Sequence, residues 1–283
     1  MAPKTNVAEK TTSNSKPSSL SENILRLAKT SQVYWFAAHA ASIVCFAVWQ
    51  LVGFFSRASA QRYSRLTLFF QLVSYGVVIW KSVPVAKTKN KIQLLRNENV
   101  QYFAFAAVLL LCSIKLIPWT KPVLPFIVYS FFHAITYFQK NLLEHLPVSL
   151  HTQAAINDRI TFISSNYNLQ ALYFASLSEL SLLIDIILGI PGLLFYIFRD
   201  PVYVAFFVFR SLAVLVFLKL RYDESQYTRQ AVQQLDARIG GVLANPMVPA
   251  QLRDLYYGPV KNAISNYAGL VSVPKIASAK KSQ

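Results

Sequence analysis

Four charged residues lie inside apolar stretches of the chain, where an ionisable side chain is costly and is therefore a candidate for function. Glu179 and Asp185 share one stretch, Arg210 lies in the next, and Lys115 lies near the end of an earlier one. A spacing of six residues places the second side chain about 240° around the helix from the first, beyond one full turn. The two carboxylates therefore do not share a helix face, and a carboxylate pair for acid–base chemistry is not predicted.

Glu179 and Arg210 are instead predicted to form an ion pair across the last helical hairpin. If this hairpin folds about a midpoint near Leu194, Glu179 lies level with Arg210. An isolated charge at the bilayer centre costs several kcal/mol, so mutual neutralisation is the simplest role for the pair. We expect a structural clasp, meaning an ion pair that only holds two helices together. A role in transport is the alternative.

The histidines do not form a recognisable site. His145 and His151 lie six residues apart in a loop beside Glu144, a poor spacing for metal ligands. His39 and His133 are single histidines on apolar stretches. The sequence also contains no GxSxG, HExxH, Walker A or GxGxxG motif. The sequence therefore predicts no catalytic, cofactor or metal site, and no enzyme.

The composition indicates a membrane protein. Of the 283 residues, 54% are hydrophobic and 14% are charged, whereas a soluble domain carries about 25% charged residues. The formal net charge is +16. In a membrane protein such an excess is typical of flanks that face the anionic cytosolic leaflet. Nucleic acid is not expected as a partner, because no zinc-finger spacing or RNA-binding signature is present.

Six apolar stretches predict an all-α, multi-pass membrane domain over residues 33–218. A helix needs about 20 residues, with a range of roughly 17 to 25, to cross the hydrocarbon core. The second and fourth stretches, of 15 and 16 residues, fall short of that length, so both four and six crossings stay open. In order, the stretches are Val33–Phe55, Leu66–Trp80, Val100–Ile117, Val123–Phe138, Leu169–Leu188 and Val202–Leu218.

The connections pair these stretches into three helical hairpins. The predicted turns are Ser56–Arg65, the Pro-bounded residues 118–122, and a region that starts at Gly189–Gly192. With both termini in the cytosol, the cytosolic stretches hold 21 Lys and Arg residues and the three hairpin tips hold 5. This bias follows the positive-inside rule. Three arginines on the first tip are its exception.

The two ends of the chain are predicted to be cytosolic. Residues 1–32 are polar and rich in Ser, Thr and Lys, which is typical of disorder. Residues 219–283 are predicted to contain amphipathic helices, with a helix stop at Gly240–Gly241 and a kink or a new helix start at Gly258–Pro259.

One of these tail helices is predicted to lie on the surface of an anionic leaflet, because its apolar face is followed by a basic end. The alternative is that this face packs against the cytosolic loops of the protein itself. The residues predicted for the membrane-surface helix are Leu252, Leu255, Tyr256, Val260, Lys261, Ile264, Tyr267 and Leu270.

Two runs of sequence resemble the transmembrane protein 33 family. They are FIVYSFFHAITYFQKNL (Phe126–Leu142) and FLKLRYDESQYTRQAVQQLDARI (Phe217–Ile239). The similarity extends from about Val100 to Tyr267 and includes Glu179. The resemblance implies a membrane protein of the endoplasmic reticulum and nuclear envelope. It further implies reticulon-type shaping proteins and nuclear pore components as partners, with a part in nuclear pore assembly or distribution in fungi. It implies no catalytic residue.

Taken together, these features favour a structural membrane protein that shapes or organises membrane. A small transporter or ion-handling protein is the alternative, and a lipid-modifying enzyme is a third possibility. A transporter of the common kind would show internal repeats with broken helices, and an enzyme would show clustered polar residues on one face. The sequence shows neither pattern.

Overall fold

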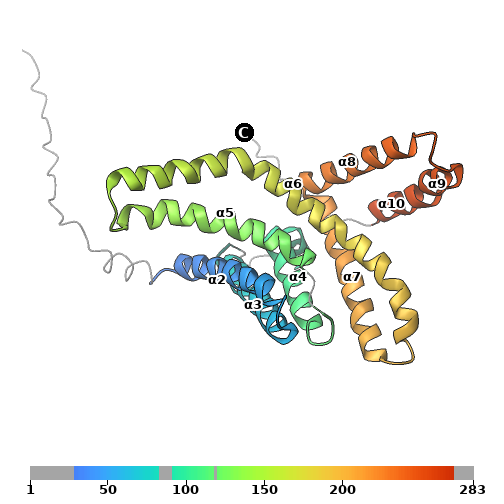
Figure 1. The fold of residues 1–283 in the computed structure, drawn as a ribbon, viewed down its shortest axis with the longest axis horizontal. Coiled ribbons are helices and arrows are strands. Elements are labelled where there is room, and N and C mark those ends of the chain that lie inside the picture. Colours follow the sequence, from blue (N-terminus) through green and yellow to red (C-terminus); the bar gives the residue numbers. More distant parts are fainter. Residues whose placement is uncertain (1–28, 83–90, 118–119, 271–283) are drawn as a thin grey trace, which may run out of the picture.

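The structure is a computed structural model that describes residues 29–82, 91–117 and 120–270. Within these ranges every regular element is helical (Figure 1), so the prediction of an all-α membrane protein is confirmed. The predicted disorder of the first 28 residues concerns a segment outside the described ranges. The α-helices are α2 (Ser31–Val52), α3 (Arg57–Ser82), α4 (Glu98–Cys112), α5 (Leu124–Asn141), α6 (Leu150–Tyr196), α7 (Pro201–Glu224), α8 (Gln226–Leu243), α9 (Ala250–Leu255) and α10 (Lys261–Ala268).

Short helical turns complete the described chain. They are 3₁₀ turns at Lys91–Arg96, Lys121–Val123 and Leu143–His145, and a π-helical turn at Tyr256–Val260 between α9 and α10.

Three of the described helices, α2, α6 and α7, are long and apolar enough to cross a membrane. Helix α4 is apolar but has only 15 residues. The third apolar stretch was predicted to reach Ile117, but its helix ends at Cys112, where the Ser113 hydroxyl donates to the Leu110 carbonyl at 2.6 Å. The second and fourth stretches lie within α3 and α5, which are longer than the apolar stretches because their polar flanks are also helical.

The helices pack in an order that differs from simple consecutive hairpins. Helix α2 packs against α3 and α5, α4 packs against α3 and α7, and α6 lies against both α5 and α7. The core lies where α3, α4, α5 and α7 meet. There the ring of Phe105 stacks on Phe217 with centroids 4.2 Å apart, and the ring of Tyr102 packs edge-on against Phe126 at 5.4 Å.

Helix α6 is the longest element, with 47 residues. Figure 1 shows its first part beside α5 and its last part beside α7. The predicted turn at Gly189–Gly192 is wrong, because α6 continues through these residues to Tyr196 with Pro191 inside the helix. Gly189 serves close packing instead, since a Cβ added there would lie 2.5 Å from the ring of Phe207. Small residues commonly allow membrane helices to approach in this way.

The tip of the last hairpin therefore lies at residues 197–200. Helix α7 begins there because Asp200 accepts a hydrogen bond from the backbone N–H of Tyr203 at 3.0 Å. Pro201 follows at the first helical position, where its missing N–H costs nothing.

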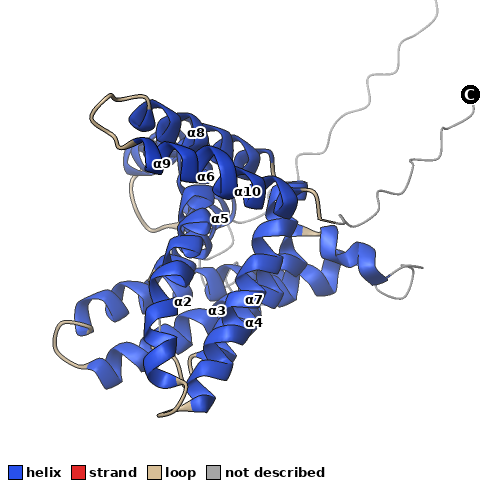
Figure 2. Cartoon of the chain, turned by 90° about the vertical axis from the view of Figure 1, so that its right-hand side faces the viewer, coloured by secondary structure: helices blue, strands red, loops and turns tan. Residues whose placement is uncertain are grey.

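Helices α8, α9 and α10 lie together at one end of the helical bundle (Figure 2). Helix α8 continues through Gly240–Gly241 to Leu243, so the predicted stop at the two glycines is wrong. At Gly258–Pro259 the chain stays helical and widens into the π-helical turn. Pro259 has no N–H to donate to the ordinary i→i−4 ladder, which is a known cause of such irregular turns.

Candidate functional site: a buried carboxylate, tyrosine and arginine

Glu179 lies deep in the helical bundle and is 1% exposed. It extends from α6 towards α4, where the hydroxyl of Tyr102 donates a hydrogen bond to its Oε1 atom. Tyr102 is equally buried, and its hydroxyl lies 3.2 Å from that of Tyr129 on α5. Tyr102 of α4 thus contacts Glu179 of α6 and Tyr129 of α5, and the group joins three helices.

Arg221, in the last turn of α7, supplies the positive charge. Its Nη2 atom lies 2.8 Å from Oε1 of Glu98 at the start of α4, and its Nε atom lies 3.6 Å from Oε2 of Glu179. Its Cζ atom also lies 4.9 Å from the ring centroid of Tyr102. We call Glu179, Tyr102, Arg221 and Glu98 the Glu179 cluster.

The contact between Arg221 and Glu179 is electrostatic. Neither Nε of Arg221 nor Oε2 of Glu179 has a hydrogen-bond partner among the described residues, because 3.6 Å exceeds hydrogen-bonding distance. Arg221 is 3% exposed, whereas the side chain of Glu98 is 53% exposed. Arg221 therefore links a fully buried carboxylate to one at the surface.

Further ion pairs fix the ends of α4 and α7 beside each other. Arg96 precedes α4 and makes two contacts to the Glu224 carboxylate, at 2.7 and 3.1 Å. Lys219 pairs with Asp223 along α7 at 2.5 Å. The side chain of Asn97 accepts a hydrogen bond from the N–H of Asn99 at 2.9 Å and caps α4. These contacts place Glu98 and Arg221 within reach of each other.

The structure does not pair Glu179 with Arg210, the partner predicted from the sequence. Among the described residues, the ion pair of Glu179 is with Arg221. The predicted midpoint near Leu194 was wrong because α6 runs on to Tyr196. With the tip at residues 197–200, the part of α7 that lies opposite Glu179 is close to Arg221. Arg221 lies just beyond the last apolar stretch, within the polar part of the run Phe217–Ile239, which was the signal that could have identified it.

Arg210 occupies a different environment. It is 6% exposed, and its Cζ atom lies 5.3 Å from the ring centroid of Phe207. It also borders a small cavity together with Trp49 and Cys112. Arg210 therefore lies nearer to the hairpin tip on α7, apart from the Glu179 cluster.

Charges near the hairpin tips have partners within the protein. The predicted turn Ser56–Arg65 is wrong beyond Ser56, because α3 begins at Arg57 and the first tip lies at residues 53–56. Arg65 therefore lies within α3, where it donates to the carbonyl of Ser113 at 2.7 Å, at the C-terminus of α4, where a cation is favoured. Lys121 pairs with Asp185 of α6 at 2.8 Å. These contacts account for two of the cations that the positive-inside count places on the tips.

A second polar group, which is uncharged, joins α2, α3 and α5. The Gln71 amide donates to Ser42 at 2.6 Å and to Ser130 at 2.9 Å. Nδ1 of His39 lies 2.8 Å from the Ser130 hydroxyl. This group could not be predicted from the sequence, because isolated Ser and Gln residues in apolar stretches do not reveal which helix face they occupy.

The residues predicted for the membrane-surface helix divide into two sets. Tyr256 donates to Asp236 of α8 at 2.7 Å, and Lys261 pairs with the same carboxylate at 3.2 Å. Tyr267 donates to the backbone carbonyl of Leu215 on α7. We call Asp236, Tyr256 and Lys261 the surface trio. The exposed apolar members of the predicted set are Leu252, Leu255, Ile264 and Leu270; the partly buried Val260 completes it.

The contacts around Asp236 and Tyr256 shift the pKa values of these two residues. The hydrogen bond from Tyr256, followed by that from Lys261, lowers the pKa of Asp236. Desolvation, followed by the bond to Asp236, raises the pKa of Tyr256 to about 12. Both shifts favour an ionised Asp236 beside a neutral Tyr256 at neutral pH.

The Glu179 cluster is suited to holding helices together. Its carboxylate is enclosed by aromatic rings, and each of its charges faces an opposite charge. Among the described residues, no group of three or more His, Cys, Asp or Glu side chains gathers as metal ligands would.

Comparison with known proteins places this arrangement in a family. The family model described as transmembrane protein 33/nucleoporin POM33 matches residues 14–269. The Saccharomyces cerevisiae protein named pore and endoplasmic reticulum protein of 33 kDa is 30% identical over 233 residues, which cover 78% of this chain and 85% of that protein. Nucleoporin POM33 of Chaetomium thermophilum is 25% identical over 291 residues, covering 93% of this chain and 96% of the relative.

A third relative is tetra-spanning protein 1 of Schizosaccharomyces pombe, which is 23% identical and covers 84% of this chain and 85% of its own length. No solved structure gives a significant match. The match of the family model to most of the chain shows that this protein belongs to the transmembrane protein 33/nucleoporin POM33 family.

Proposed function

We propose that this protein is a structural, multi-pass membrane protein of the endoplasmic reticulum and nuclear envelope that shapes membrane and contributes to nuclear pore assembly or distribution. Membership of its family supports the proposal, because the names of its relatives associate those proteins with the nuclear pore and the endoplasmic reticulum. Reticulon-type shaping proteins and pore components are the proposed partners.

The unequal lengths of the apolar helices support membrane shaping. Helices α2, α6 and α7 are long enough to cross the hydrocarbon core, while α4 has 15 residues and lies below the crossing length of about 17 residues or more. Short and long helices in one bundle occupy the two leaflets unequally, which favours curved membrane. Exposed aromatic side chains at two tips, Phe55 at 90% and Phe198 at 94%, suit contact with lipid.

The tail supports the same proposal. Leu252, Leu255, Ile264 and Leu270 are exposed, and the tail also carries Lys261. In this proposal the helices pack on α8 through the surface trio and present these apolar side chains to the anionic leaflet. Contact with the leaflet and packing against the protein itself, the two alternatives for the tail, then both occur, because different residues serve each.

A structural role for the Glu179 cluster is favoured over ion handling. Transport would need access of water or ions to the carboxylate, whereas Glu179 is 1% exposed and bonded to Tyr102. We therefore place the cluster in the role of a clasp, and the functional surfaces at the tips and the tail.

Topology can be tested with single cysteines introduced into a full chain in which Cys45 and Cys112 are replaced. Ala58→Cys and Arg199→Cys mark the first and last tips, and Gln226→Cys marks the start of α8. We expect a membrane-impermeant maleimide to label position 226 in intact microsomes and the two tips only after permeabilisation. Labelling of position 58 in intact microsomes would show that the first hairpin does not cross.

Function can be tested by deleting the gene in its own host and imaging nuclear pores. We expect pores to cluster or to fall in number, and the wild-type chain to restore them. A chain with Leu252→Ser and Ile264→Ser should stay in the membrane and restore the pores incompletely. Val242→Ser on α8, a more exposed apolar residue outside the predicted face, is the control. Normal pores in the deleted strain would contradict the proposal.

A further inference from the structure

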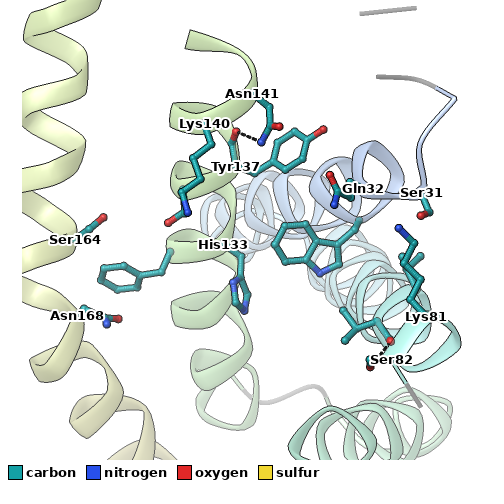
Figure 3. A pocket seen from close by; sticks show the side chains of 15 residues that line it. Ser31, Gln32, Lys81, Ser82, His133, Tyr137, Lys140, Asn141, Ser164 and Asn168 are labelled. Carbon is teal, nitrogen blue, oxygen red and sulfur yellow. Dashed lines mark hydrogen bonds between the residues drawn. The ribbon is translucent and has the colours of Figure 1, made fainter. Parts of the chain in front are cut away.

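A cavity of about 600 Å³ opens between the start of α2, the end of α3, the end of α5 and the middle of α6. Figure 3 shows that side chains from several helices line it, with Lys81 and Lys140 on different walls. Its volume lies within the range of about 300–1,000 Å³ that is typical of small-molecule sites. The Glu179 cluster and the surface trio do not line it.

The cavity carries positive charge that no acid of its lining balances. Its lining includes Lys81 and Lys140 but no Asp or Glu. Neither lysine forms an ion pair with a described carboxylate. Each lies in the last turn of its helix, where a cation is favoured by the helix dipole. That preference explains one lysine on each helix, but it does not require both to border the same cavity.

Two buried polar atoms in the wall lack partners. The Tyr137 hydroxyl, on a residue that is 6% exposed, and the Ser164 hydroxyl form no hydrogen bond with the described residues. A buried hydroxyl without a partner costs about 1–3 kcal/mol. Both oxygens are shielded in this conformation, so a ligand in the cavity would bind them after rotation of the Tyr137 or Ser164 side chain.

Part of the wall is apolar and aromatic, although polar side chains such as Gln32 and Asn168 also line the cavity. Trp35 of α2, Val77 of α3 and Phe132 of α5 line it. The ring of Trp35 lies 5.1 Å from that of His133 and 6.3 Å from that of Tyr137. A polar, cationic side and an apolar side within one cavity match a ligand that has both an anionic head and a hydrocarbon tail.

We propose that this cavity binds one anionic glycerophospholipid, with its phosphate between Lys81 and Lys140. The polar head then accepts or donates hydrogen bonds at Tyr137, Ser164 and the amide of Asn168. The acyl chains pass Val77 and Phe132 into the bilayer. A free phosphate shares the charge chemistry but leaves the apolar wall without a partner. The inference does not depend on membrane shaping, because it concerns lipid bound within the bundle.

The test uses the purified full-length chain in a lipid-free detergent, with its thermal midpoint measured against added ligands. Short-chain dioctanoylphosphatidylinositol should raise the midpoint, because a ligand that binds only the folded state stabilises it. Dioctanoylphosphatidylcholine and inorganic phosphate at the same concentrations should raise it far less. These arms separate an anionic lipid from a zwitterionic lipid and from a free anion.

The double variant Lys81→Gln/Lys140→Gln should require an about tenfold higher phosphatidylinositol concentration for the same shift, as expected for the loss of a charge-assisted hydrogen bond. The matched control, Arg159→Gln/Arg238→Gln, removes two exposed cations that do not line the cavity. It should respond like the wild type. Both double variants carry exposed substitutions, so their midpoints without lipid should match the wild type.

Tyr137→Phe provides a second, independent readout. Removing a hydroxyl without a partner should leave the midpoint in detergent unchanged or higher, while the stabilisation by phosphatidylinositol falls. The proposal is overturned if inorganic phosphate stabilises the chain as strongly as phosphatidylinositol. It is also overturned if the lysine double variant and its control respond equally to the lipid.

Discussion

The protein contains the same three chemical groups twice, once buried and once at the surface. In the Glu179 cluster, a carboxylate accepts from Tyr102 while Arg221 lies over that tyrosine ring at 4.9 Å. In the surface trio, Asp236 accepts from Tyr256 while Lys261 lies 5.8 Å from its ring centroid. The side chains of Glu179 and Arg221 are 1% and 3% exposed, and those of Asp236 and Lys261 are 45% and 39% exposed.

The comparison shows that solvent, more than the set of residues, decides what such a group does. Water screens the surface trio, so each of its contacts contributes little and can open or close with conditions. In the buried cluster a charge that loses its partner has no water to replace it. The surface trio therefore suits a tail that docks reversibly, and the Glu179 cluster suits a permanent link between helices.

The largest effect is expected for Arg221→Leu. This change leaves Glu179 buried without a cation and should lower the free energy of unfolding by about 3–5 kcal/mol, the cost of breaking a buried pair. The measurement is the thermal midpoint of the full chain in detergent. Arg238→Leu, on an exposed arginine of α8, is the control. A loss no larger than that of the control would remove the distinction between the two sites.

A second substitution should partly reverse that loss. Adding Glu179→Gln to Arg221→Leu removes the uncompensated charge while keeping an acceptor for Tyr102. We expect the double variant to be more stable than Arg221→Leu alone. Additive losses in the double-mutant cycle would mean that the two side chains do not interact.

The tyrosines offer an intermediate test. Tyr102→Phe removes the hydrogen-bond donor of a buried carboxylate and should cost about 1.5–3 kcal/mol. Tyr256→Phe removes the corresponding donor in the surface trio, where water can take its place, so a smaller loss is expected. The measurement is the thermal midpoint of each variant relative to that of the wild type. Equal losses would indicate that solvent does not separate the sites.

The smallest effect is expected from pH, and only at the surface trio. The pKa of Asp236 is lowered, so its contribution to docking is present above the ordinary aspartate pKa and is lost as pH falls through the lowered value. The pKa of Tyr256 is raised to about 12, so its contribution is complete below the ordinary tyrosine pKa and is lost as pH rises through about 12.

Hydrogen exchange in α10 between these limits measures this docking. Protection should be flat at neutral pH and fall towards both extremes. In Asp236→Asn the loss on the acid side should disappear. An acid-side loss that is unchanged in this variant would assign it to another group.

Much of the fold could be predicted from the sequence, because apolar runs have to become helices in a membrane. The exact helix ends could not be predicted in the same way. Gly189 and Pro191 are helix breakers by type, yet α6 continues through them. Gly189 instead allows the ring of Phe207 to approach the helix closely. That difference moved the tip of the last hairpin and changed the partner expected for Glu179.

The candidate site was predicted less completely than the fold. The sequence predicted a partner for the intramembrane glutamate but not the one observed; in the structure Glu179 is buried and bonded to Tyr102. Tyr102, the donor to Glu179, and Glu98, the second carboxylate beside Arg221, both lie on α4. Only tertiary packing brings α4 beside α6 and α7. The same limit applies to the Gln71 group and to the cavity beside Lys81 and Lys140, which four separate helices build.

Membrane shaping by this chain can be measured by reconstituting the purified full-length protein into large vesicles and imaging them by electron cryomicroscopy. The vesicles contain phosphatidylcholine, phosphatidylethanolamine and phosphatidylinositol, and an unrelated multi-pass protein at equal density is the control. We predict narrow tubules, or vesicles of clearly smaller diameter than those of the control. Vesicles of the same diameter and shape in both samples would contradict the account.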